Sequence, residues 1–438
     1  MKRALPLLAL VLGSCGLLCL PGPRTLATPT GETARATVVE VDNTGLQRHG
    51  LIEFGTQRLT VRLADGAVKE AHNELRAQLE LDKKFAPGDT ALVVLGAEPL
   101  VARDHWRLGW AAALFGAFCA LLCAFGGWTG AKALFSFVFS CIAVWKLLVP
   151  LCLDGWNAAW TSFAVGDAAL VVLGAEPLVA RDHWRLGWAF ALFAAFAALL
   201  CAFGGWTGAK ALFSFVFSCV AVWKLLVPLC LDGWNAAWTS FAVVTVLTAV
   251  IMYLVAGWTR KGLAAFLGAM LGVAASLALA GFFSAAMHVN GATMPFVQTL
   301  LYSGYVDLDL ADVFVGATIL ASSGAVMDLA MDIAAGIGEV ARHNPGLPRR
   351  ELFLSGLRIG RSVVGTMTTT LLLAYSGGYL TLLMVFAAQG TAPLDFLNST
   401  LVSAELVKTL VGSFGLVLVA PFTALVGAVV FQRRVQLP

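Results

Sequence analysis

The sequence carries little charge for its length. Only 13% of its 438 residues are Asp, Glu, Lys or Arg, and 59% are hydrophobic, whereas soluble domains carry about 25% charged residues. Such a chain cannot cover its surface with polar groups, which excludes an ordinary water-soluble fold. The net charge is only +3, and no basic run with interleaved aromatic residues occurs, which excludes nucleic acid as a partner. The composition predicts an integral membrane protein whose main partner is the lipid bilayer.

Motifs for metal ions, cofactors and catalysis are also missing. The chain has no CxxC, no HExxH and no Cys/His cluster with metal-ligand spacing. Seven of the nine cysteines lie inside apolar runs, where thiols behave as small hydrophobic groups. Gly324, Asp328 and Asp332 match half of the signature of enzymes that transfer phosphoalcohols from CDP-activated lipids, but the acids that would complete a two-metal site are missing. We therefore expect that the protein is not an enzyme and has neither a cofactor nor a metal site.

The N-terminus is typical of a secretory signal. Lys2 and Arg3 precede an apolar stretch, residues 4–20, which is followed by a Pro-Gly-Pro sequence. A basic start, a short apolar segment and a helix breaker are the parts of a signal peptide. Residues 1–27 are therefore predicted to be a signal peptide or a signal anchor, and the residues that follow are predicted to be exported.

Residues 36–100 read as a small β domain. Polar and apolar residues alternate over 36–41 and 58–63, Asp65-Gly66 is typical of a hairpin turn, and a further strand pattern begins at Ala91. These features predict a small antiparallel barrel or sandwich. Because it follows the signal segment, we expect it to be extracytoplasmic.

An internal repeat covers the middle of the chain. Residues 88–165 recur as 166–243 at an offset of 78, with only five differences. Near-identity of this kind indicates a tandem duplication or an error of sequence assembly rather than an inverted functional repeat. Each copy holds one strand and two helix candidates, so the copy adds an even number of spans. We expect the first copy's strand to complete the β domain, and the second copy's helices to lead into the next span.

Nine apolar stretches are long enough to cross a membrane, which takes about 20 residues in a helix. The first pair lies within 107–153, and the tandem copy, 166–231, supplies a strand and a second pair. The remaining five form a transmembrane core over 239–432, at 239–256, 263–286, 311–338, 363–388 and 408–431. The fold class that follows is a polytopic α-helical membrane protein with a small extracytoplasmic β domain near its N-terminus.

Charges between the spans predict the orientation. With the β domain outside, nine basic residues fall inside, where Lys and Arg concentrate: Lys132, Lys210, Arg260, Lys261, Arg342, Arg349, Arg350, Arg433 and Arg434. The opposite loops contain no basic residue and four acidic ones: Asp154, Asp232, Asp307 and Asp309. This pattern places the C-terminus inside.

Several segments of the core carry a more specific pattern. They are GAVMDLAMDIA from Gly324, Asn344-Pro345, ELFLSGLRIGR from Glu351, GTMTTTLLLAY from Gly365, LVGSFG from Leu410 and GWTRK from Gly257. These segments resemble the YibE/F family of bacterial multi-pass membrane proteins, most specifically over 324–375. The chain departs from the family pattern at Ser362, which is usually Asp, and at Thr369, which is usually Asn. The resemblance implies a protein of the bacterial cytoplasmic (inner) membrane. It implies a class of membrane protein and does not imply a particular reaction.

Three acids share one face of a predicted helix within this signature. Asp328, Asp332 and Glu339 stand at positions i, i+4 and i+11. An Asp in the hydrocarbon costs about 2.5–3.5 kcal/mol on insertion scales, and such residues usually line a polar interior or a pathway. The next segment offers partners for them: Arg358, Arg361, Thr366, Thr369 and Thr370. Two interpretations stay open, an ion-pair network that fixes packing and a lining for an ion or solute.

These features predict transport or channel-like passage of an ion or small solute. Gly377-Gly378 interrupts the span that carries the threonines, and breaks of this kind occur where transporters bind ions. The alternative is a non-transporting membrane protein whose β domain binds an extracytoplasmic partner. A homo-oligomer is compatible with either function.

Overall fold

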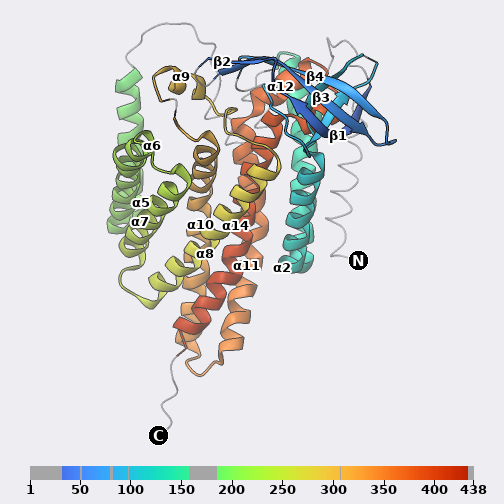
Figure 1. Ribbon diagram of the computed structural model, residues 1–438. Helices are drawn as coiled ribbons and strands as arrows, with labels where there is room; N and C mark the ends of the chain where they lie inside the picture. Colours follow the sequence, from blue (N-terminus) through green and yellow to red (C-terminus); the bar gives the residue numbers. More distant parts are fainter. Residues whose placement is uncertain are drawn as a thin grey trace.

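The computed structural model describes residues 32–49, 52–78, 82–96, 98–156, 185–305 and 307–432. A small β domain lies at one end of a long helical bundle (Figure 1). The predicted signal segment, the strand of the second repeat copy, Arg433 and Arg434 lie outside the described residues.

The described part of the β domain forms one six-stranded sheet. Its strands follow the order β1-β5-β6-β4-β3-β2, and β1 also pairs with β3, so the sheet curls into a barrel-like form. All pairs are antiparallel except β4 with β6. The strands are β1 (Thr33–Asp42), β2 (Leu46–His49), β3 (Ile52–Leu63), β4 (Val68–Arg76), β5 (Thr90–Val94) and β6 (Leu100–His105).

The strand patterns explain this domain. In β1 the apolar residues Ala36 and Val38 are buried while Thr37 between them is exposed, as expected for a sheet with one covered face. The turn between β3 and β4 lies at Asp65-Gly66, where Gly66 has a φ of +87°, a value that glycine adopts without strain. The expected small β domain is confirmed. It extends past residue 100, because β5 and β6 of the first repeat copy complete the sheet.

The rest of the described chain is helical. Six segments are long and apolar enough to cross a membrane, and α11 with α12, which meet at 62°, supplies a seventh if the pair is one span. The main helices are α2 (Leu108–Ala143), α5 (Arg185–Ala221), α7 (Ala236–Ala256), α8 (Arg260–Ala286), α10 (Leu310–His343), α11 (Arg349–Gly378), α12 (Leu380–Ala388) and α14 (Thr400–Val430). The shorter ones are α3 (Val149–Leu153), α6 (Val227–Leu231), α9 (Val297–Tyr302) and α13 (Pro393–Asn398).

Helices α2 and α5 are each two helices joined at a glycine. Gly127 has φ +54° and ψ −130°, which is not a helical conformation. The rings of Phe115 and Phe137 lie 6.2 Å apart, whereas a straight helix would separate these positions by about 33 Å. Gly205 has the same conformation in α5. Each repeat copy therefore forms a helical hairpin, and all nine predicted segments are found as helices.

The centre of the bundle is built from α8, α10, α14, α11 and α7 (Figure 1). Glycines let these helices pack closely, as is common between membrane helices. A Cβ on Gly356 would lie 2.8 Å from the Cβ of Ala424, and one on Gly415 would lie 2.1 Å from the Ser276 hydroxyl oxygen. The α2 hairpin packs against α11 and α14, whereas the α5 hairpin packs against α7.

The described basic residues that predict the inner side lie at one end of the bundle. Helix α8 begins at Arg260, α10 ends at His343 and α11 begins at Arg349, all at the end opposite the β domain (Figure 1). Asp309 caps the other end of α10, next to the β domain. The basic residues and the acidic residue Asp309 thus lie at opposite ends of the bundle, and the side of the membrane on which each end lies stays a prediction.

Deleting residues 166–243 should leave membrane insertion and the orientation of later helices unchanged. The deletion removes one hairpin, whose two crossings leave together, and residues 158–165 restore the lost start of α7 because both copies are identical there. The two hairpins pack at different places, one against α11 and α14 and the other against α7. The single hairpin that remains can make only one of these sets of contacts, so we expect a lower melting temperature in detergent. A single cysteine at Arg349, probed with an impermeant thiol reagent, reports orientation. Altered reactivity of that cysteine would show that insertion needs both copies.

Candidate functional site

The predicted acidic face lies on the outside of the bundle. Asp328, Asp332 and Glu339 are exposed on α10, on the side opposite its buried residues Ala330 and Ile337. Glu339 forms an ion pair with Arg342 of its own helix, at 2.8 Å. The other two carboxylates have no ion pair among the described residues. In a membrane, these charged groups require a polar neighbour or water.

The two predicted arginines lie on the next helix, α11, and do not reach these acids. Among the described residues, no ion pair joins Asp328 or Asp332 to Arg358 or Arg361. The Nε of Arg361 instead donates to the carbonyl of Phe125 at 2.5 Å, and its guanidinium lies 5.9 Å from the centre of that ring. Among the described residues, these acids and arginines therefore form no ion-pair network with one another.

A row of polar residues runs along the exposed side of α11. Arg358, Ser362 and Thr366 are exposed, and Thr369 is half-buried. The hydroxyls of Thr366, Thr369 and Thr370 donate to carbonyls of their own helix, which leaves their oxygen lone pairs as acceptors. Residues at spacings of three and four share one side of a helix, so this side continues through Leu373 to Ser376. We call Arg358, Ser362, Thr366, Thr369 and Ser376 the α11 track.

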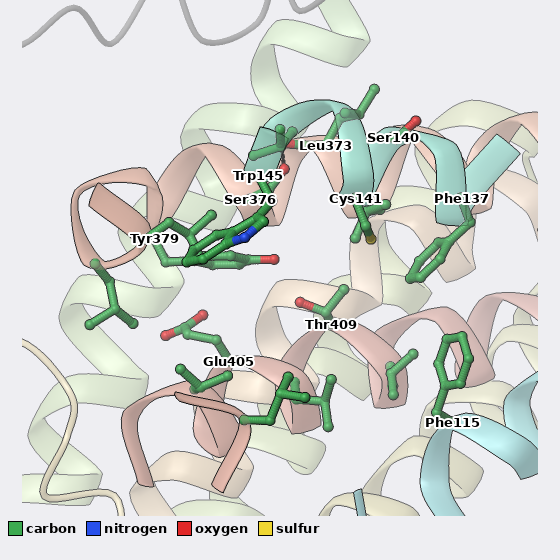
Figure 2. Close-up of a pocket in the computed structure, with 18 of the residues that line it drawn as sticks. Phe115, Phe137, Ser140, Cys141, Trp145, Leu373, Ser376, Tyr379, Glu405 and Thr409 are labelled. Carbon is green, nitrogen blue, oxygen red and sulfur yellow. Dashed lines mark hydrogen bonds between the residues drawn. The ribbon is translucent and has the colours of Figure 1, made fainter. Parts of the chain in front are cut away.

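The α11 track ends at a cavity within the bundle (Figure 2). The cavity has a volume of about 300 Å³ and lies between the second arm of α2, the α11–α12 break and the start of α14. Its walls are mostly apolar. The polar groups among its lining residues include Ser140, Ser376, Tyr379, Glu405 and Thr409.

Three side chains give the cavity its chemistry. Figure 2 shows Tyr379, Glu405 and Thr409 around the same space. Tyr379 lies at the 62° bend between α11 and α12, so the predicted interruption at Gly377-Gly378 is confirmed. Glu405 pairs with Lys408 at 2.8 Å. The Thr409 hydroxyl is buried and lies at the same space as the Tyr379 hydroxyl.

Sequence reasoning missed these cavity residues. The predicted last span starts at residue 408, whereas α14 begins at Thr400 and carries Glu405 in its second turn. A signal existed, because Glu405 and Lys408 stand at i and i+3 directly before an apolar run. Tyr379 and Thr409 carry no local signal, since their meeting depends on the bend and on tertiary packing.

A second polar assembly joins the β domain to the bundle. Arg107 is 1% exposed, pairs with Asp104 at 2.5 Å, and donates to the carbonyls of Met287 and Asn398. Burial, with the nearby charges of His288 and Arg107, lowers the pKa of His105 to about 3. This imidazole is therefore neutral at physiological pH.

The helices and the sheet together define a multi-pass membrane protein with a small N-terminal β domain. Residues 114–175 and 192–433 match the family model of the YibE/F-like proteins, so the chain belongs to the YibE/F-like family. The two matched segments begin at Leu114 and Leu192, which are equivalent positions of the repeat. No curated protein and no solved structure shows significant similarity to the chain.

Proposed function

We propose that this protein moves an ion or small solute across the bacterial cytoplasmic membrane, with the β domain outside and the C-terminus inside. The observation that carries the proposal is the α11 track, which leads from the basic end of the bundle into the cavity at the α11–α12 break. Transporters commonly bind substrates where a membrane helix is interrupted. A protein that serves only as a membrane anchor has no need for a row of polar side chains such as the α11 track.

Apart from Arg358 at the basic end, and Lys408, which pairs with Glu405, the groups along this route favour a cation or a solute that donates hydrogen bonds. The acids Asp328 and Asp332 lie on α10, which packs directly against α11; a Cβ on Gly336 would lie 2.6 Å from Cδ1 of Ile359. Hydroxyl oxygens of the threonines and the carboxylate of Glu405 are acceptors. Keeping such groups in a membrane is costly, which supports a role in binding.

A flux screen in liposomes tests the proposal. The purified full-length chain is reconstituted into liposomes with an entrapped dye for the ion under test, together with a pH dye, and gradients of Na⁺, K⁺, Mg²⁺ or phosphate are imposed in turn. We expect at least one gradient to produce a flux that protein-free liposomes lack. If no probe moves, and the isolated protein instead retains an extracytoplasmic partner through its β domain, the non-transporting alternative is favoured.

The repeat supplies a matched pair for locating the path. Cys141 lines the cavity, whereas its copy Cys219 lies on the α5 hairpin, which packs against α7. In a background with a single cysteine, a bulky membrane-permeant thiol reagent on Cys141 should block flux by filling the cavity. The same reagent on Cys219 should leave flux unchanged. Equal inhibition at both positions would exclude the cavity as the path.

The outward position of the acids is also compatible with a homo-oligomer. Asp328 and Asp332 are exposed in one chain, and a second copy that presents polar residues there would cover them. Mass measurement of the protein in detergent reports the oligomeric state directly.

A further inference from the structure

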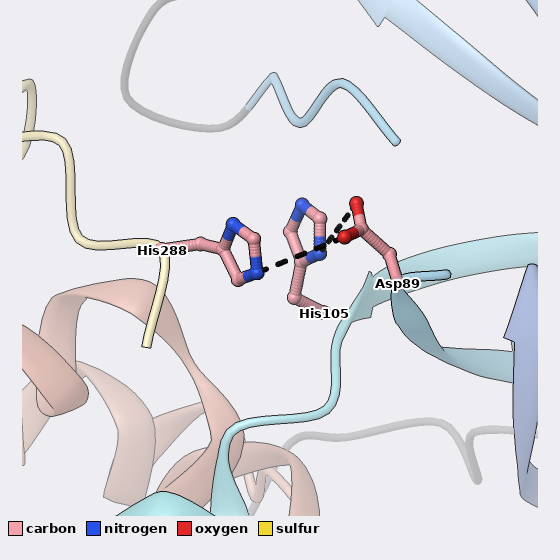
Figure 3. A group of neighbouring side chains, drawn as sticks. All are labelled: Asp89, His105 and His288. Atoms are coloured by element: carbon pink, nitrogen blue, oxygen red, sulfur yellow. Dashed lines mark ion pairs between the residues drawn. The ribbon is translucent and has the colours of Figure 1, made fainter. Parts of the chain in front are cut away.

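Three side chains from three segments meet where the β domain contacts the bundle (Figure 3). Asp89 precedes β5, His105 ends β6 and His288 follows α8. One carboxylate oxygen of Asp89 lies 3.8 Å from Nδ1 of His105, and the other lies 3.9 Å from Nε2 of His288. One ligand atom from each residue fits within 4.8 Å of the others. The 3.8 and 3.9 Å separations are too long for hydrogen bonds.

The fold builds this arrangement. His105 pairs with Ala91 across the β5–β6 ladder, and Asp89 lies two residues before Ala91, on the same face of the sheet. The amide of Ala86 donates to the Asp89 carboxylate at 2.8 Å and fixes it. The ring of His288 stacks on that of His105, with centres 4.3 Å apart.

The buried imidazole lacks a partner. His105 is 4% exposed, and its Nδ1 has no hydrogen-bond partner among the described residues. Buried polar atoms are nearly always satisfied by protein, water or a ligand. This nitrogen faces Asp89 in Figure 3, so a ligand between the two would satisfy both.

The donor set fits one class of ligand. Two imidazoles and one carboxylate, with water in the fourth position, are typical of Zn²⁺ sites with three protein ligands. With bonds of about 2.0–2.1 Å, the ligand atoms of a tetrahedral ion lie about 3.3 Å apart. The two Asp89–histidine separations must therefore shorten by roughly 0.5 Å, and the widest pair of ligand atoms, which lies within 4.8 Å, must shorten by up to about 1.5 Å. The side chain of His288 is 49% exposed and has room to make this movement.

We propose that Asp89, His105 and His288 bind a divalent transition-metal ion of the zinc class. The ion clamps the β domain onto the end of α8, and this role is independent of the transport proposed above. A cavity of about 530 Å³, lined by both histidines, Lys83 and Arg107, gives access for the ion and its water. Arg107 is paired with Asp104, so its charge is compensated locally.

Metal titration of the full-length protein in detergent tests this site. After treatment with a chelator and its removal, Zn²⁺ should raise the melting temperature by several degrees, whereas Mg²⁺, which prefers oxygen ligands, should not. Co²⁺ should give the visible absorption of a four-coordinate site. Both signals should disappear in Asp89→Asn and in His288→Asn. Asn is chosen at 288 because the backbone there has a φ of +50°, which Asn tolerates.

The repeat again provides the control. His183 is the copy of His105, and the variant His183→Asn should keep both metal signals. The proposal is overturned if the wild type shows no Zn²⁺-dependent stabilisation, or if His288→Asn keeps it. Loss of the signals in His183→Asn but not in Asp89→Asn would also overturn it, because the ligands would then come from the second copy.

Discussion

Replacing Arg107 by Met is expected to lower the free energy of unfolding by about 3–5 kcal/mol, the usual effect of removing one partner from a buried ion pair. The guanidinium is fully buried and contacts the Asp104 carboxylate and the Met287 carbonyl. Met keeps most of the apolar stem, so the loss reports the charged group rather than a cavity. Denaturation of the purified protein in mixed micelles measures the difference.

Arg185, the copy of Arg107, is the matched control. It begins α5, whose hairpin packs on α7 and away from the β domain. Arg185→Met should change stability by no more than about 0.5 kcal/mol, the usual range for a substitution that breaks no buried ion pair. Equal losses of stability in both variants would show that the arginine stabilises only the start of its own helix, and that the contacts of Arg107 with the β domain and with Met287 contribute nothing. Asn398 donates to the His105 carbonyl at 2.6 Å, so Asn398→Ala combined with Arg107→Met should cost less than the sum of the two.

The spans and the β domain were predictable because their signals are local. The nine predicted apolar stretches lie in helices, and the break at Gly377-Gly378 lies at the bend between α11 and α12. The Asp65-Gly66 turn also lies where the sequence places it. Each of these depends on residues within about 20 positions of one another, and over such distances periodicity and turn chemistry decide the structure.

The sites depend on contacts between distant residues and were not predictable in the same way. Arg107 and Asn398 are hydrogen-bonded although they are 291 positions apart in the sequence, and no local sequence pattern predicts that contact. Periodicity correctly puts Asp328 and Asp332 on one face of α10. It cannot tell whether that face looks into the bundle or out of it, because both faces of a membrane helix are apolar enough to be buried.

Replacing Asp328 or Asp332 by Asn is expected to leave the melting temperature unchanged and to reduce flux about tenfold or more. Within the chain neither acid has an ion pair among the described residues, so removing its charge leaves no buried cation alone. Insertion should be intact or slightly better, because the desolvation cost falls. Loss of about 1.4 kcal/mol of attraction for a passing cation corresponds to a tenfold change in its affinity for this part of the path. Glu339→Gln, at an exposed pair, is the control and should alter neither quantity.

The double variant Asp328→Asn with Arg358→Gln separates the two roles of the acidic face. Since the described structure joins neither residue to the other, the double variant should melt like the wild type. A melting temperature that falls in Asp328→Asn and recovers in the double variant would mean that the two charges meet in the assembled protein. Because they do not meet within one chain, Arg358 would then come from a second copy, and the acids would belong to an interface. Unchanged flux in both Asp→Asn variants would instead remove α10 from the path and leave only α11 and the cavity.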